Sequence, residues 1–227
     1  GDVQAKLMYQ QQPMKMASAE AACHDGTAFS VLTIGDLESN RCEDVTPILE
    51  IPGVLSFLAN GDFDTDMPGV KTLIPEYEEA YGTHMPEGDM YGEYSGTEID
   101  YQPSMFVTYW GFRLMIGFGA LAAAAAVFAL FVTRRGTVPR SRFLSRLALW
   151  GIAAPFIANS AGWIFTEMGR QPFVVAPNPD PSGIDGVFLY TAAAVSPSVS
   201  AAELLTSVIL LTLVYGVLMV VELKLIM

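Results

Sequence analysis

The chain has 227 residues, of which 52% are hydrophobic, and a formal net charge of −12 at pH 7. Residues 1–103 carry 19 Asp and Glu against 4 Lys and Arg, whereas the 124 residues that follow carry 5 against 8. The acidity therefore belongs to the first part of the chain, and it argues against a nucleic-acid partner. The apolar second part indicates an integral membrane protein.

Residues 1–103 are predicted to form an exterior region that consists mostly of loop. A helix is expected over residues 4–22, with Pro13 near the start of its second half, and a short apolar element over residues 48–60, broken at Pro52 and Gly53. The remainder has Gly, Pro and acidic residues without a regular period. The chain begins with Gly rather than Met, so it is expected to be processed or to be a fragment.

Cys23 and Cys42 are the only cysteines of the chain, and both lie in the region predicted to be outside. An oxidising compartment favours a disulfide between them. Closing a loop across 19 positions would stabilise the fold by roughly 3 kcal/mol in the chain-entropy model. Two unrelated thiols are the alternative.

Three hydrophobic segments predict an all-α membrane domain over residues 104–227, with spans at about 104–133, 143–173 and 201–227. At about 1.5 Å rise per residue, each span can cross a hydrocarbon core of about 30 Å.

The distribution of arginines predicts the orientation of these spans. The link between the first two contains four of them, whereas the link over residues 174–200 has neither Lys nor Arg; the four are Arg134, Arg135, Arg140 and Arg142. The positive-inside rule places the arginine-rich link in the cytoplasm, and residues 1–103 outside.

The second span carries a polar stripe near its end. Asn159, Trp163, Glu167 and Arg170 follow a spacing of 4, 4 and 3, which puts them on one face of a helix and lets Glu167 pair with Arg170. A charge at membrane depth costs about 2.5–3.5 kcal/mol on insertion scales, so such residues usually mark an ion path or a cofactor.

The first span contains Met115 between Gly111 and Gly119, all on one face, where a flat macrocycle could approach the backbone. A Met thioether can ligate haem iron, and Arg113 nearby could bind a haem propionate. The alternatives are that Met115 fills a core and that the glycines are helix contacts.

Three motifs together resemble the C-terminal half of subunit I of a cytochrome bd-type quinol oxidase. They are QQPMKMASAEA over residues 11–21, WGFRLM over 110–115 and GWIFTEMGRQP over 162–172. Their order agrees with that family, and the resemblance covers essentially the whole chain.

The resemblance implies a role for several residues. Lys15 and Glu20 match residues that serve the quinol. Met115 matches an axial ligand of the low-spin haem b, and Arg113 matches the arginine that stabilises that haem.

The third motif carries the remaining implied site. Glu167 matches the carboxylate that ligates or borders the high-spin haem b, Trp163 an aromatic residue between haems, and Arg170 the arginine close by. Phe173 stands where the family usually has Trp, a departure expected to alter packing more than chemistry.

The resemblance also implies partners and an activity. The family's axial histidines come from its N-terminal half, whereas His24 and His84 both lie in the predicted exterior region. We therefore expect a C-terminal portion of a subunit that works with the missing half and a second subunit in the bacterial inner membrane. The implied reaction oxidises membrane quinol outside and reduces O₂ to water at haem d and haem b, which builds a proton gradient. A carrier or channel with Glu167 and Arg170 on an ion path is the main alternative, and a membrane anchor with an acidic receptor domain is another.

Overall fold

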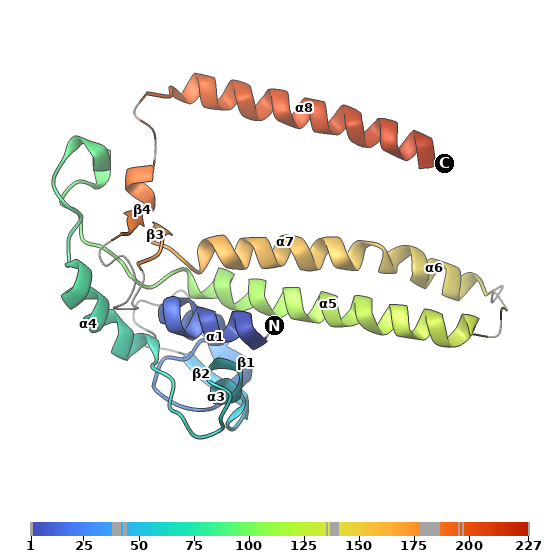
Figure 1. Cartoon of the computed structure of the whole chain (residues 1–227), viewed down its shortest axis with the longest axis horizontal. Coiled ribbons are helices and arrows are strands. Elements are labelled where there is room, and N and C mark those ends of the chain that lie inside the picture. The colour runs from blue at the N-terminus through green and yellow to red at the C-terminus, as the bar shows by residue number, and fades with distance from the viewer. Residues whose placement is uncertain are drawn as a thin grey trace.

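A computed structural model describes residues 2–37, 42, 45–134, 136, 141–177, 187–194, 196 and 198–226. The N-terminal elements gather at one end of long helices that run side by side, and the last helix lies apart from them (Figure 1). The N-terminal elements are α1 Asp2–Gln11, α2 Pro13–Glu20, β1 Phe29–Gly35, β2 Val45–Ile51, α3 Val54–Ala59, α4 Val70–Tyr81 and the 3₁₀ helix η2 Asp89–Tyr94.

The helix predicted over residues 4–22 is confirmed as two helices that meet at Gln12. Pro13 opens α2 because the first position of a helix needs no backbone N–H donor. The predicted break at Pro52 and Gly53 is also confirmed. Gly53 has a φ of 73° and lies so close to Phe63 that a side chain would come within 3.1 Å of it.

The chain is mostly helical, in agreement with the predicted fold class, but it is not helical throughout. β1 pairs with β2 in an antiparallel sheet, and β3 (Phe173–Val175) pairs with β4 (Leu189–Tyr190) in another. The expectation that the rest of residues 1–103 is loop is wrong. Helix α4 was also missed. It contains Pro75, which the sequence marks as a breaker, yet the helix continues through it.

The core of the N-terminal region forms around α2, whose residues 14–20 are all buried. Its neighbours are α4, the first turns of α5 and the β3–β4 hairpin. Burying each large apolar side chain here stabilises the fold by about 1.5–3 kcal/mol. The least exposed apolar members are Ala19, Val70, Leu73, Tyr101, Met105 and Tyr109.

Cys23 and Cys42 form a disulfide in the structure, with their Cα atoms 5.5 Å apart and both side chains buried. The bridge ties the segment after α2 to the segment before β2. We expect negligible labelling of the denatured protein by a thiol reagent without reductant, and labelling of both cysteines after reduction. Ready labelling of both without reductant would exclude the bridge.

The helices predicted over residues 104–133 and 201–227 are confirmed as α5 (Met105–Thr133) and α8 (Ala201–Ile226). Among the described residues these are the two helices long and apolar enough to cross a membrane, with mean hydropathies of 2.4 and 2.6. Ser104 begins α5 by accepting a hydrogen bond from the Val107 backbone N–H at 3.5 Å.

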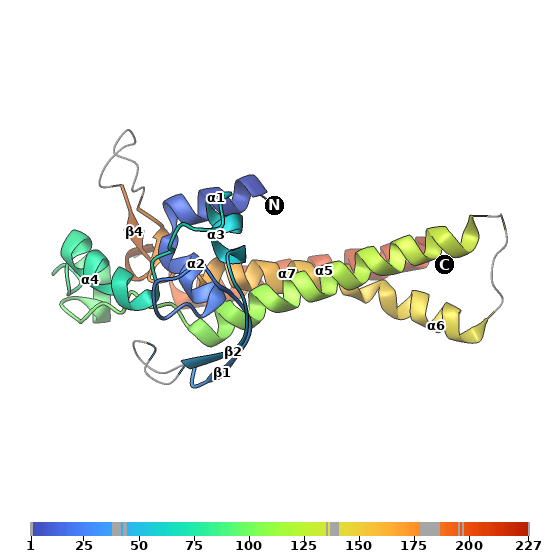
Figure 2. The same cartoon turned by 90° about the horizontal axis from the view of Figure 1, so that it is seen from below.

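The prediction of one continuous helix over residues 143–173 is wrong. The segment forms α6 (Arg142–Gly151) and α7 (Ala153–Met168), which meet at Ile152. Pro155 explains the break, because it has no N–H to donate to the Gly151 carbonyl. Helices α6 and α7 follow one another along α5 in Figure 1. Figure 2 shows that α6 turns away from α5. A membrane crossing by α6 and α7 together stays a prediction.

Helices α5 and α7 pack closely, whereas α8 does not pack on them. Residues 201–225 are exposed apart from Gly216, and α8 lies away from α5 and α7 in Figure 1. Its apolar surface is therefore not covered by the described residues of this chain. The orientation prediction falls partly outside the described residues, which do not include Arg135, Arg140 or residues 178–186.

Candidate functional site

Helix α2 lies against the ends of both α5 and α7, and this contact brings the predicted site residues together. Lys15 near its start points to α7, whereas Glu20 at its end points to α5. Both side chains are buried. The helix stops after Glu20 because Ala21 adopts a left-handed conformation with a φ of 50°.

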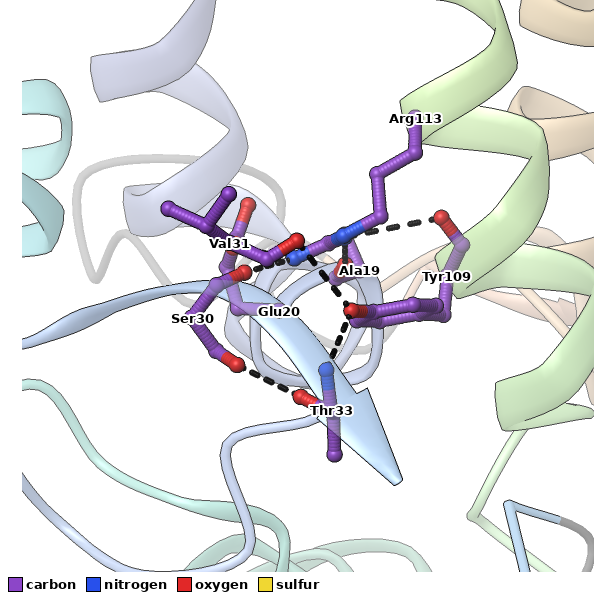
Figure 3. A network of polar contacts seen from close by, with 7 residues as sticks. All are labelled: Ala19, Glu20, Ser30, Val31, Thr33, Tyr109 and Arg113. Atoms are coloured by element: carbon purple, nitrogen blue, oxygen red, sulfur yellow. Dashed lines mark hydrogen bonds and ion pairs between the residues drawn. The ribbon is translucent and has the colours of Figure 1, made fainter. Parts of the chain in front are cut away.

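Arg113 connects α5 to the end of α2 and to β1. Its Nη2 lies 3.1 Å from Glu20 Oε2, its Nη1 donates to the Ala19 carbonyl at 2.5 Å, and it also donates to the Ser30 carbonyl (Figure 3). The guanidinium lies over the Tyr109 ring, 3.4 Å from the ring centre. Arg113 therefore holds a carboxylate of its own chain, an anion that the sequence analysis did not assign to it.

Glu20 has little contact with solvent, at 3% exposed. Burial raises the pKa of Glu20 to about 7, and the charge of Arg113 opposes this rise. At neutral pH this carboxyl group can therefore both take up and release a proton. Removing one partner of such a buried pair costs about 3–5 kcal/mol, because the other charge is left unpaired.

Lys15 belongs to α2, and its side chain reaches the C-terminal end of α7. Its Nζ donates to the Thr166 carbonyl at 3.4 Å and lies over the Phe165 ring, 5.0 Å from the centre. Burial lowers the pKa of Lys15, as does the charge of Arg170, while Glu167 raises it. Lys15 is therefore electrostatically coupled to the Glu167–Arg170 pair at the C-terminal end of α7.

Lys15 and Glu20 do not face one pocket. A shallow, open pocket lies beside Lys15, and Glu20 is not among its lining residues. This separation agrees with the turn of about 140° that five residues make in a helix. The pocket is lined by Gln12, Met14, Lys15, Tyr77, Tyr101, Gly169, Arg170, Gln171, Phe173, Ala176 and Pro177.

The aromatic side of this pocket was missed by the sequence analysis. Tyr77 of α4 and Tyr101 have ring centres 5.6 Å apart, and Phe173 stacks on Tyr190 at 5.1 Å. Phe173 is only 3% exposed, so its ring packs inside this cluster. The sequence signal for this aromatic cluster was the spacing of Tyr77 and Tyr81, which are four residues apart and therefore lie on one face of a helix.

Tyr77 also supports the start of α2. Its hydroxyl is hydrogen-bonded to the backbone of Met14, next to Lys15, and burial raises the pKa of Tyr77 to about 12. The phenol therefore stays protonated at neutral pH. This contact satisfies a polar group at the start of α2, where the helix has no side-chain cap.

The polar stripe of α7 faces away from α5. Glu167 and Arg170 form an ion pair, with side chains 37% and 28% exposed, and Trp163 is 68% exposed. The opposite face of α7 is buried at Ala158, Ala161 and Phe165, among others. The Arg170 Nε is buried, and no described residue is hydrogen-bonded to it.

Met115 packs on α7 at Gly162, where an added Cβ would lie 2.8 Å from the Met115 Sδ. Gly111 also contacts α7, because a Cβ there would lie 3.3 Å from Phe165. The expectation of a face open to a macrocycle is therefore wrong at Gly111, which is a helix contact. At Gly119 a side chain would meet nothing within 4 Å.

Some side chains of α5 and α7 are of types that can hold a haem group. A thioether and a carboxylate are known types of axial ligand, and α7 presents Trp163 and Glu167 on an open face. The described residues contain no group of three or more His, Cys, Asp or Glu that could hold a metal ion by itself.

Comparison with known proteins shows the family of the chain. The family model "Cytochrome bd terminal oxidase subunit I" matches residues 1–227. The chain is 36% identical over 225 residues to cytochrome bd ubiquinol oxidase subunit 1 of Bacillus subtilis (strain 168), with 96% of this chain covered. It is 30% identical over 216 residues to cytochrome bd-II ubiquinol oxidase subunit 1 of Escherichia coli (strain K12), with 77% covered.

These matches cover only part of each relative, 41% of the Bacillus subtilis protein and 42% of the Escherichia coli protein. A further relative, the putative cytochrome bd menaquinol oxidase subunit I of Bacillus subtilis (strain 168), is 30% identical over 178 residues, which is 77% of this chain and 34% of the relative. The family match extends over the whole chain, however. The chain therefore belongs to the cytochrome bd terminal oxidase subunit I family.

Proposed function

We propose that this chain forms the quinol-oxidising part of a terminal respiratory oxidase subunit. One observation carries the proposal: α2, with Lys15 and Glu20, is packed on α5 and α7, the helices that carry Met115 and Glu167. A substrate bound beside α2 would lie next to both helices. Members of this family are membrane proteins, and the two long apolar helices fit that setting.

In this proposal the quinol head group enters the pocket beside Lys15. Tyr77 and Phe173 offer apolar ring faces, and the Lys15 ammonium offers a donor to a quinol oxygen. Each quinol loses two electrons and two protons. As the protons leave, negative charge rises on the quinol oxygen, and a cation at hydrogen-bonding distance stabilises it.

Glu20 serves the reaction from the opposite face of α2. Its pKa of about 7 suits a group that takes up a proton and passes it on at neutral pH. Since it does not line the pocket, Glu20 would receive the proton indirectly rather than touch the head group.

For the haems, we propose that Met115 holds a low-spin haem b and that Glu167 holds or borders a high-spin haem b, with Trp163 and Arg170 beside it. Bound haems, including haem d, supply electron transfer and the reduction of O₂ to water. The histidine ligands would come from the rest of the subunit, and a second subunit would complete the complex.

We place residues 1–103 outside the bacterial inner membrane and the arginine-rich link inside. Met115 is the eleventh residue of α5, about 15 Å from its outer end, so it lies in the outer half of the bilayer. Quinol protons would leave to the outside. Protons for water would come from the cytoplasm, and this difference would build the proton gradient.

Lys15→Ala is expected to raise the apparent KM for quinol about tenfold or more, because a charge-assisted hydrogen bond worth about 1.5–3 kcal/mol is lost. The low-spin haem band should stay unchanged, since the Lys15 ammonium contacts α7 at Thr166 and Phe165 rather than at Met115. Steady-state quinol oxidation by the purified complex measures the effect. Lys71→Ala, which removes an exposed cation of the same region, is the control. Unchanged KM in Lys15→Ala would refute the assignment.

A further inference from the structure

The contact between α2 and the end of α7 leaves no room for a side chain at residue 169. A Cβ built on Gly169 would lie 2.9 Å from the Phe165 carbonyl oxygen, 3.0 Å from Lys15 Cγ and 3.1 Å from Thr108 Cγ2. The three neighbours belong to α7, α2 and α5. Gly169 is therefore the point where these three helices approach one another.

The reason for glycine at this position is space and not backbone conformation. Gly169 has a φ of −73° and a ψ of −9°, which every residue type adopts readily. Its N–H also donates to the Phe165 carbonyl at 2.9 Å, as any residue except proline could. The absence of a Cβ is required by the approach of the Phe165 carbonyl oxygen, Lys15 and Thr108.

This close approach determines where the Lys15 ammonium lies. The carbonyl groups of the last helical turn carry partial negative charge, and Lys15 Nζ lies among them, 3.4 Å from the Thr166 oxygen. The Phe165 ring adds a cation–π contact at 5.0 Å. If the stem of Lys15 is displaced from Gly169, the ammonium leaves both partners and moves relative to the pocket.

We infer that Gly169 is a positioning residue for quinol oxidation, and that it acts through Lys15. The inference rests on the proposed role of Lys15 in binding the quinol. Gly169 itself lines the pocket only with its backbone, so it offers no side chain to the substrate. Its contribution is to let α2 approach α7 closely enough to fix the lysine against the helix end.

Gly169→Ala in the complete oxidase is expected to raise the apparent KM for quinol about tenfold while kcat changes by less than about twofold, since a displacement on the scale of 1 Å is costly. Gly26→Ala is the matched control. Gly26 lies in the N-terminal region that also contains Lys15, and a Cβ there would meet nothing within 4 Å. Its kinetic constants should equal those of the unmodified enzyme.

A double-mutant cycle with Lys15→Met separates this role from a general packing defect. Met keeps an unbranched apolar stem but has no ammonium, so Gly169→Ala should then change KM by less than about twofold. The same tenfold rise in both backgrounds would overturn the inference, as would an unchanged KM in Gly169→Ala alone. A fall in kcat at unchanged KM would also overturn it, because the effect would then lie at Glu167 on the same helical turn.

Failure of the proposed function gives a different result. If Lys15→Met alone leaves the KM unchanged, Lys15 does not bind the quinol, whatever Gly169 does. If Gly169→Ala does not assemble, Gly169→Ala/Thr108→Ser replaces it, with Thr108→Ser as its reference. That change removes the Thr108 methyl group and keeps the hydroxyl that donates to the Ser104 carbonyl at 2.8 Å. The same rise and the same cancellation by Lys15→Met are expected.

Discussion

Glu167→Ala is expected to lower O₂ consumption by about 100-fold or more and to alter the spectrum of the high-spin haem. The substitution removes an oxygen donor from the open face of α7 and leaves the Arg170 guanidinium without its anion. An unpaired charge at membrane depth is costly, and its electrostatic effect on a nearby reaction is of order several kcal/mol. Oxygen uptake and the absorption spectrum of the purified complex measure both effects.

The control for Glu167→Ala is Glu203→Ala, which removes an exposed carboxylate at the start of α8. Glu203 accepts hydrogen bonds from Ser200 at 2.8 Å, so its loss should weaken only the helix end. Normal O₂ consumption in Glu167→Ala would show that the Glu167–Arg170 pair is a structural ion pair without a role in the reaction.

Met115→Leu is expected to weaken the low-spin haem signal or convert it to a high-spin signal, with a lowered reduction potential. Leu conserves the packing volume against Gly162 but has no sulfur lone pair. A thioether ligand raises the potential of a haem, so its loss acts in the opposite direction. Redox titration followed by optical absorption measures both changes, while the haem at Glu167 should be retained.

Met105→Leu provides the matched control, because Met105 is buried in the same helix and packs in the core of the N-terminal region. It should cost less than about 1.5 kcal/mol of stability and leave the spectrum unchanged. An unchanged low-spin spectrum in Met115→Leu would show that Met115 fills the α5–α7 contact and binds no iron.

Hydropathy was sufficient to predict α5 and α8, because a run of apolar residues long enough to cross a bilayer needs no information about partners. The break between α6 and α7 could have been read from Pro155, whose missing N–H acts locally. The β1–β2 sheet was missed. One of its contacts joins β1 to α5, where the Thr33 N–H donates to the Tyr109 hydroxyl at 2.9 Å, and no local pattern shows a contact between residues 76 positions apart.

The candidate site was predicted residue by residue but not as an arrangement. Glu20 and Arg113 are 93 positions apart, and the sequence assigned them to different functions. Their pairing depends on how α2 packs on α5, which no local pattern encodes. The same holds for Lys15 and Thr166, 151 positions apart. The left-handed Ala21 that ends α2 gave no signal either, since a left-handed turn usually appears as Gly or Asn.

The absorption spectrum of the purified complex, reduced minus oxidised, tests the central claim most directly. The account predicts haem bands of the b and d types in the unmodified complex. It also predicts that the low-spin b band is weakened or converted to a high-spin band in Met115→Leu. A spectrum without haem bands would contradict the account, and would favour an ion path along Glu167 and Arg170 or a membrane anchor instead.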